Sequence, residues 1–189
     1  MVLVFAVLLG IAIGLALGGR VGRLADLQLR GIPLFAIVMA CQIVIFPTGM
    51  FPWTIPEGLA TAASLLTYAL LVLVAVLNRK VRGFPIAAVG MACNLLAIAG
   101  NGGHMPALPR AMRAAGLTYS GVHNNSVADA NPHVAWLVDR WGAPGWLPMA
   151  NVYSVGDVLL AVGTVVIISA AMGARVPRLR FPRSGISEA

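Results

Sequence analysis

Charged residues are scarce in this chain, since Asp, Glu, Lys and Arg together make up only 10% of its 189 residues. A soluble domain carries roughly 25% charged residues, so this chain has too few to cover a surface that faces water. Hydrophobic residues make up 59% of the chain, and the mean hydropathy is +0.89. This composition excludes a soluble globular enzyme, a disordered tail and a secreted disulfide scaffold, and it indicates an integral membrane protein.

Cysteine is also rare. Only Cys41 and Cys93 are present, and both lie inside apolar segments. Disulfide scaffolds place their cysteines in ordered regions of oxidising compartments, so we expect two free, buried thiols here. The sequence contains no CxxC, no zinc-ligand spacing, no phosphate-binding glycine loop and no Ser–His–Asp set. It therefore shows no nucleophile or acid–base pair that would indicate an enzyme, and it identifies no cofactor.

Long apolar runs, by contrast, are plentiful. A membrane span needs roughly 20 predominantly apolar residues, and five segments reach or approach that length, at about 2–18, 32–46, 59–77, 84–99 and 152–172. The first segment lacks a positively charged start and an obvious cleavage site, so we interpret it as a retained helix and not as a signal peptide. We predict an all-α integral membrane protein with five transmembrane helices in residues 1–173, followed by a basic cytoplasmic tail over 174–189.

Basic residues lie in short clusters between these segments. Ten of the 13 Lys and Arg residues follow the first, third and fifth segments, on one predicted side of the membrane. The positive-inside rule places that side in the cytoplasm, with the amino terminus outside and the carboxyl terminus inside. All four tryptophans lie in the predicted outer connections, where indole rings anchor a protein at the interface. Anionic headgroups of the lipid bilayer account for the net charge of +7, so nucleic acid is not an expected partner.

A repeat relates the second and fourth segments. Residues 30–42 align without gaps onto residues 82–94, and seven of 13 positions are identical, including Arg, Gly, Pro and a Met-Ala-Cys triplet. We therefore expect two hairpins, of segments one and two and of segments three and four, arranged as a parallel repeat beside an unpaired fifth helix. Such repeats occur in transporters, but a gene duplication without transport is equally compatible with the alignment.

Glycines recur at four-residue spacing in the first segment, at Gly10, Gly14 and Gly18. A face of small residues lets another helix approach closely, although glycine is common in membrane helices in any case. We predict a helix-packing face there and infer no function from it.

Polar side chains recur at one depth in the outer halves of four segments. Asp157 is their only ionisable group and lies about five residues into the last segment. We predict that these side chains form an outward-facing pocket in which the Asp157 carboxylate contacts Asn94, Tyr68 or Asn101. Interhelical hydrogen bonds that only hold the bundle together are the alternative. The candidate ligand-binding residues are Gln42, Ser64, Tyr68, Asn94, Asn101, His104, Asn151, Tyr153, Ser154 and Asp157.

The outer connection, residues 100–151, is too long to be a simple linker. It contains a candidate helix over 108–115, and we expect its turn at 101–104 to lie directly above Asp157. Its histidines His104, His123 and His133 are spaced by 19 and 10 residues, which matches no ligand motif. We therefore expect no metal, heme or quinone site in this connection.

Two stretches resemble a known family. NLLAIAGNGGHMP at 94–106 and NVYSVGDVLLAVG at 151–163 are similar to motifs of small bacterial membrane proteins catalogued as domain of unknown function 5317. The glycine-rich first segment is also similar, so the resemblance covers most of residues 1–173 and is weakest over 123–146. The resemblance implies a five-helix, multi-pass protein of the bacterial inner membrane, and it supplies no activity, substrate or catalytic residue.

Two functions remain open from the sequence. The first is a module that binds or helps to transport a small molecule or ion in the polar pocket. The second is an accessory or assembly subunit of a larger membrane complex, which would use the glycine face and the outer connection as contacts. Five helices are few for an autonomous transporter, so either function favours a homo-oligomer or a partner protein.

Overall fold

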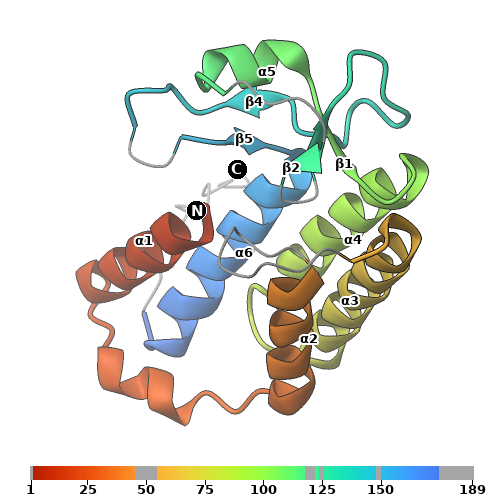
Figure 1. The fold of residues 1–189 in the computed structure, drawn as a ribbon. Coiled ribbons are helices and arrows are strands. Elements are labelled where there is room, and N and C mark those ends of the chain that lie inside the picture. Colours follow the sequence, from red (N-terminus) through yellow and green to blue (C-terminus); the bar gives the residue numbers. More distant parts are fainter. Residues whose placement is uncertain (1, 46–54, 118–121, 124–125, 148–149, 175–189) are drawn as a thin grey trace, which may run out of the picture.

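The computed structural model describes residues 2–45, 55–117, 122–123, 126–147 and 150–174. Within these ranges, five long helices lie at the five predicted segments (Figure 1). They are α1 (Val2–Ala16), α2 (Ile32–Ile45), α3 (Glu57–Leu77), α4 (Phe84–Gly100) and α6 (Val155–Ala171). Only α3 is long and apolar enough to cross a membrane by itself, over Gly58–Leu77, and the other four are shorter apolar helices.

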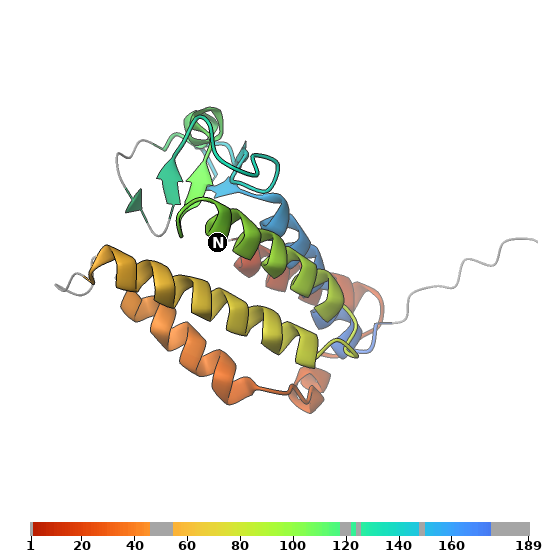
Figure 2. The same cartoon turned by 90° about the vertical axis from the view of Figure 1, so that its right-hand side faces the viewer.

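The long helices pack as a row in the order α2, α3, α4, α6, α1, as the two views together show (Figure 1, Figure 2). The predicted pairing of the third and fourth segments is therefore present as the α3–α4 contact. The predicted pairing of the first two segments is wrong, because α1 packs against α6. The expectation of an unpaired last helix is also wrong, since α6 lies between α4 and α1.

Glycines explain why α1 packs closely against α6. A Cβ atom added at Gly10 would lie 3.0 Å from Cβ of Ile168, and one at Gly14 would meet the side chain of Met172. These two glycines thus form the predicted packing face, into which the large side chains of α6 fit. Gly18 does not belong to it, because nothing lies within 4 Å of the position of its Cβ. Its φ of +77° instead allows the chain to turn just after α1 ends.

The contact between α4 and α6 is even closer. A Cβ atom at Gly90 would lie 2.6 Å from the carbonyl oxygen of Gly156, and one at Gly163 would lie 2.8 Å from the backbone nitrogen of Ala87. The two helices therefore touch backbone to backbone along a stripe of small residues. This close approach brings polar side chains near the end of α4 against the start of α6.

The described residues of 101–154, which we call the cap, cover one end of the row (Figure 1, Figure 2). The cap corrects the prediction of an all-α fold, because it contains short strands. Strands β1 (Met105–Ala107), β3 (Ser126–Ala128) and β2 (Val122–His123) form one sheet in the order β1-β3-β2, and β4 (Trp141–Gly142) pairs with β5 (Val152–Tyr153). Helix α5 (Pro109–Ala114) confirms the helix predicted over 108–115. These short ladders satisfy backbone groups that a long connection would otherwise leave unpaired.

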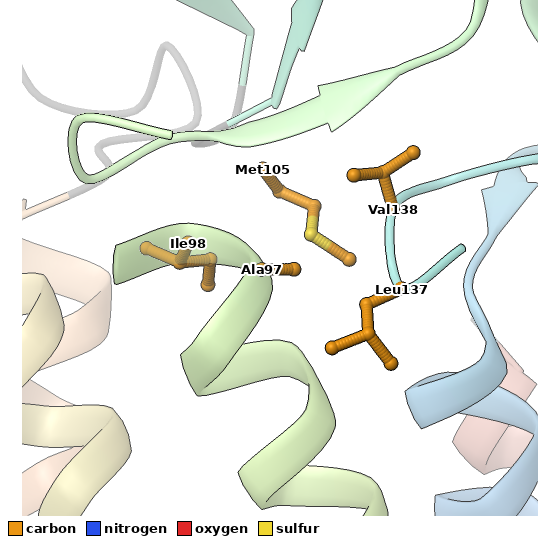
Figure 3. Close-up of a cluster of buried hydrophobic side chains, with 5 residues drawn as sticks. All are labelled: Ala97, Ile98, Met105, Leu137 and Val138. Carbon is orange, nitrogen blue, oxygen red and sulfur yellow. The ribbon is translucent and has the colours of Figure 1, made fainter. Parts of the chain in front are cut away.

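An apolar cluster fixes the cap to the end of α4. Figure 3 shows Met105 of β1 beside Ala97 and Ile98 of α4, with Leu137 and Val138 of the cap on its other side. Leu137 and Val138 are almost completely buried. The cap is therefore held on the bundle by a hydrophobic core of its own.

Helices α2 and α4, which contain the repeated sequence, begin in the same way. Gly31 and Gly83 each have a positive φ, of +80° and +92°, and each is followed two residues later by a proline in the first turn of the helix. Proline is favoured in a first helical turn, where its missing N–H has no partner to lose. The two cysteines of the repeat are both free, as expected, but the expected burial is wrong, because Cys41 is exposed and Cys93 is only half-buried.

Candidate functional site

A hydrogen-bonded network joins the end of α4 to the start of α6. Asn94 Nδ2 donates to Asp157 Oδ1 at 3.0 Å, so the predicted contact between these two residues is present. Ser154 Oγ donates to Asn94 Oδ1 at 2.8 Å, and the backbone N–H of Ser154 donates to Asp157 Oδ2 at 3.0 Å. Asn94 and Ser154 are both buried. The network thus orients the Asp157 carboxylate with donors on both of its oxygens.

The same network shows that Asp157 is a helix-capping residue. Ser154 is the N-cap of α6, its Oγ accepts from the backbone N–H of Asp157 at 3.0 Å, and together the two residues form a capping box. Asp157 therefore lies in the first turn of α6, and the predicted depth of about five residues is wrong. The cause is strand β5, which takes Val152 and Tyr153 out of the helix. This capping supports part of the alternative interpretation, in which Asp157 serves the structure.

A small cavity lies between the cap and the bundle, beside this network. Its volume is about 160 Å³. Four of the predicted site residues line it, namely Tyr68, Asn94, Asn151 and Asp157. The other lining residues are Ile98, Met105, Ser126, Asp139 and Val152. The structure thus places a polar cavity at the predicted location, with the cap as its cover.

Asp139 is the ionisable lining residue that the sequence did not predict for the pocket. It is only 5% exposed, and its backbone holds the cap together through bonds with Pro106 and Leu108. Among the described residues, none donates a hydrogen bond to its carboxylate or forms an ion pair with it. Burial, and then the nearby charge of Asp157, raises the pKa of Asp139 to about 7. The Asp139 side chain is therefore almost fully covered, its carboxyl group borders the cavity without a donor among the described residues, and its pKa lies near neutral pH.

The neighbouring Arg140 does not neutralise this carboxylate. Its guanidinium carbon lies 5.6 Å from the centroid of the Trp141 ring, within the range of a cation–π contact. No Lys, Arg or His residue lines the described cavity. Among the side chains that the structure describes, the cavity consequently has two carboxyl groups and no positive charge.

Other predicted site residues lie elsewhere. Asn101 ties the cap to α4, because its side chain donates to the carbonyl oxygens of Ala97 and His133 and accepts from the backbone N–H of His133. The 101–104 turn does not cover Asp157 as expected, since Gly103 packs against Thr61 of α3. His104 is absent from the lining of the cavity.

The remaining candidates belong to other contacts. Gln42 Nε2 donates to Thr67 Oγ1 at 2.6 Å and so joins α2 to α3, and Thr67 Oγ1 donates to the backbone oxygen of Ser64 at 2.8 Å. Tyr153 lies in β5 opposite Trp141. The single polar layer that the sequence suggested is therefore two separate clusters, one between α2 and α3 and one between α4 and α6.

The chemistry of the cavity favours a small cation. Two carboxyl groups in a partly dehydrated space attract positive charge and repel anions. No group of three or more His, Cys, Asp or Glu side chains that could hold a metal ion occurs in the described ranges. A cavity of about 150 Å³ accommodates benzene, so this one has room for an organic cation of about six non-hydrogen atoms.

Comparison with known proteins gives a single result. A family model described as a family of unknown function (DUF5317) matches residues 26–169. No curated protein and no solved structure matches the chain.

Proposed function

We propose that this chain, which belongs to the DUF5317 family of unknown function, is a multi-pass membrane protein that binds a small organic cation between its cap and its helices. The observation that carries the proposal is Asp139, which is 5% exposed, lines the cavity and receives no hydrogen bond at its carboxylate from the described part of the chain. Proteins rarely bury a charge without a partner, because desolvation costs several kcal/mol. A bound cation, or a proton in its absence, would supply that partner.

Exposed apolar side chains support the membrane part of the proposal. Large hydrophobic residues are exposed on all five long helices of the described chain, and Leu8, Ile37 and Leu66 are 59%, 60% and 61% exposed. Soluble monomers rarely expose contiguous apolar patches larger than a few hundred Å². Contact with lipid accounts for these faces.

Four of the five long helices are shorter than the hydrocarbon core of a bilayer is thick. Helices α1, α2, α4 and α6 have 14 to 17 residues, which corresponds to about 21–26 Å. The hydrocarbon core is about 30 Å thick. Flanking residues and local thinning of the bilayer close such a gap at a modest cost, so we propose that all five helices cross.

Charge asymmetry supports an outward-facing cavity. The cap lies at one end of the row (Figure 1) and contains Arg110, Arg113 and Arg140. The connections between α1 and α2 and between α3 and α4, at the opposite end, contain six basic residues, namely Arg20, Arg23, Arg30, Arg79, Lys80 and Arg82. The positive-inside rule assigns the basic end to the cytoplasm. The cap and its cavity then face the outside.

Asp139 and Asp157 have different tasks in this proposal. Asp157 receives hydrogen bonds from Asn94 and Ser154, so its charge is already stabilised. Asp139 receives none from the described residues and is the group that pairs with the ligand. A proton competes with the cation at Asp139, so binding and protonation are coupled.

Three probes of similar shape but different charge test the proposal. Tetramethylammonium, tert-butanol and trimethylacetate are added to the detergent-purified protein, and the thermal unfolding midpoint is measured. The cation is expected to raise the midpoint, while the neutral and anionic probes leave it unchanged, since a ligand stabilises only the state that it binds. Asp139→Asn should abolish the shift. Asp129→Asn is the matched control, because Asp129 lies in the same cap but its carboxylate accepts from the N–H of Asn131.

An equal shift with all three probes would show an apolar cavity without charge selection and would end the proposal. Loss of the shift in both variants would mean that the cap, and not the Asp139 carboxylate, controls binding.

One of the two arguments for an accessory subunit of a larger membrane complex fails. It needed the glycine face of α1 as a contact for a partner, and Gly10 and Gly14 are occupied by α6 of the same chain. The other argument, contacts made by the outer connection, stays a prediction.

A further inference from the structure

Two adjoining cavities lie at the end of the molecule opposite the cap. The first, which we call the basic chamber, has a volume of about 350 Å³ and is lined by Arg30, Arg79 and Lys80 among others. The second, which we call the apolar slot, has a volume of about 170 Å³ and lies between α2, α3 and α4. Arg30 and Asn78 line both cavities, so the chamber and the slot meet at these two residues.

We infer that the chamber and the slot together bind one anionic phospholipid, with its phosphate in the chamber and one acyl chain in the slot. The inference is separate from the cation cavity, and shares with it only the membrane location of the protein.

The basic chamber has the charge that a phosphate group requires. Arg30, Arg79 and Lys80 are all exposed, and none of them forms an ion pair with another described residue. No acidic residue of the described ranges lines the chamber. Each Lys or Arg near a membrane surface attracts anionic lipid by about 1 kcal/mol. The three cations are thus available to an anion from the bilayer.

The apolar slot has the walls that an acyl chain requires. Its lining includes Phe35, Leu71, Val74, Phe84 and Met91 from three helices. Phe35 is exposed, although a large aromatic side chain gains most from contact with other apolar groups. A free phosphate or a soluble anion would leave this slot empty, whereas a phospholipid fills both parts at once.

A buried asparagine preorganises the junction of the two parts. Asn78 is only 3% exposed, and its Nδ2 donates to the carbonyl oxygen of Arg30 while its Oδ1 accepts from the N–H of Arg30, both at 2.8 Å. Nδ2 also donates to the carbonyl oxygen of Val74 at 2.8 Å. These bonds clamp the backbone of Arg30 to the end of α3 before Gly31 turns the chain into α2. The Arg30 side chain therefore starts from a fixed point at the mouth of the slot.

Native mass spectrometry of the detergent-purified protein tests the inference. Phosphatidylglycerol and phosphatidylcholine with identical acyl chains are titrated, and one phosphatidylglycerol is expected to remain bound at concentrations where phosphatidylcholine does not. Arg30→Gln, Arg79→Gln and Lys80→Gln should each weaken binding by about fivefold, and the triple variant should weaken it far more. The matched control replaces Arg110, Arg113 and Arg140 of the cap with Gln and should bind as the native chain does.

Two further arms separate the phospholipid from a free phosphate. Inorganic phosphate and glycerophosphoglycerol, which have no acyl chains, should fail to displace the bound lipid. Phe35→Ala should weaken phosphatidylglycerol binding several-fold, while Ile37→Ala, an exposed position of the same helix outside the slot, should not. Displacement by inorganic phosphate, or native binding by Phe35→Ala, would overturn the inference. Equal retention of the two lipids would overturn it as well.

Discussion

The two ends of the molecule carry cavities of opposite charge, and each depends on a buried asparagine. At the capped end, Asn94 joins α4 to α6 and orients the Asp157 carboxylate. At the other end, Asn78 clamps Arg30 to α3. The difference lies in solvation. Asp139 at the capped end is 5% exposed and has no donor among the described residues, whereas Arg30 is exposed.

This difference teaches that the two cavities need ligands to different degrees. An exposed cation is solvated by water or headgroups, so an empty basic chamber costs little free energy. A carboxylate that is only 5% exposed is solvated far less, so an empty acidic cavity favours the protonated acid. The capped end should therefore respond strongly to pH and to small cations. The basic end should respond mainly to lipid composition.

The largest expected effect is a pH dependence of stability that belongs to the capped end alone. Burial raises the pKa of Asp139 from 3.8 to about 7, so ionising it costs on the order of 4 kcal/mol more in the folded chain than in the unfolded chain. Between these two values the folded chain holds a proton that the unfolded chain has lost, so the unfolding free energy falls as the pH rises from about 4 to 7 and levels off above.

Chemical unfolding of the detergent-purified protein over this pH range measures the effect. Asp139→Asn should remove most of the slope, and Arg30→Gln should keep it. If the slope is the same in Asp139→Asn and in the native chain, ionisation of Asp139 costs no more in the folded chain than in the unfolded chain, which contradicts the prediction.

An intermediate effect is expected when each asparagine is removed. Asn94→Ala and Asn78→Ala should each lower the unfolding free energy by about 2 kcal/mol, because each leaves buried polar groups without a partner. The two variants should differ in which ligand they bind more weakly. Asn94→Ala should weaken tetramethylammonium binding and spare phosphatidylglycerol, while Asn78→Ala should do the reverse. Binding of both ligands by both variants would indicate that neither asparagine positions its cavity.

The smallest effect is expected from Asp157→Asn. The amide keeps the shape of the capping residue, but its nitrogen cannot accept the hydrogen bond that one of the two carboxylate oxygens receives from Asn94 or Ser154. Because these bonds are only partly buried, the unfolding free energy should fall by about 1 kcal/mol. Cation binding should weaken less than in Asp139→Asn. If cation binding weakens more in Asp157→Asn than in Asp139→Asn, Asp157 and not Asp139 is the carboxylate that pairs with the ligand.

Much of the architecture could be predicted from apolar run lengths and composition. The five long helices lie where the apolar segments predict them, and the contact of Asn94 with Asp157 follows from placing polar groups on facing helices. The pairing of α1 with α6 could not be predicted, because glycine spacing shows that a helix packs closely and does not show which partner it takes. Strands of two or three residues are too short for any periodicity to reveal.

Two features of the site have signals in the sequence. Ser154 and Asp157 precede an apolar run with the spacing of a capping box, which places the start of α6 after Ser154. Asp139 directly follows the apolar residues Leu137 and Val138. An apolar pair inside a polar connection suggests a buried segment, and the structure buries Asp139 together with this pair. That no described residue pairs with the Asp139 carboxylate, however, depends on the packing of the cap and is visible only in three dimensions.

The most direct test of the central claim is the affinity for tetramethylammonium at pH 6 and at pH 8, measured by calorimetry. A carboxylate with a pKa near 7 must lose its proton before it pairs with the cation, so the affinity of the native chain should rise about tenfold between these two pH values. Asp139→Asn should bind weakly, with the same affinity at both. An affinity of the native chain that does not change with pH, or one that Asp139→Asn retains, would contradict the claim that this buried carboxylate holds the ligand.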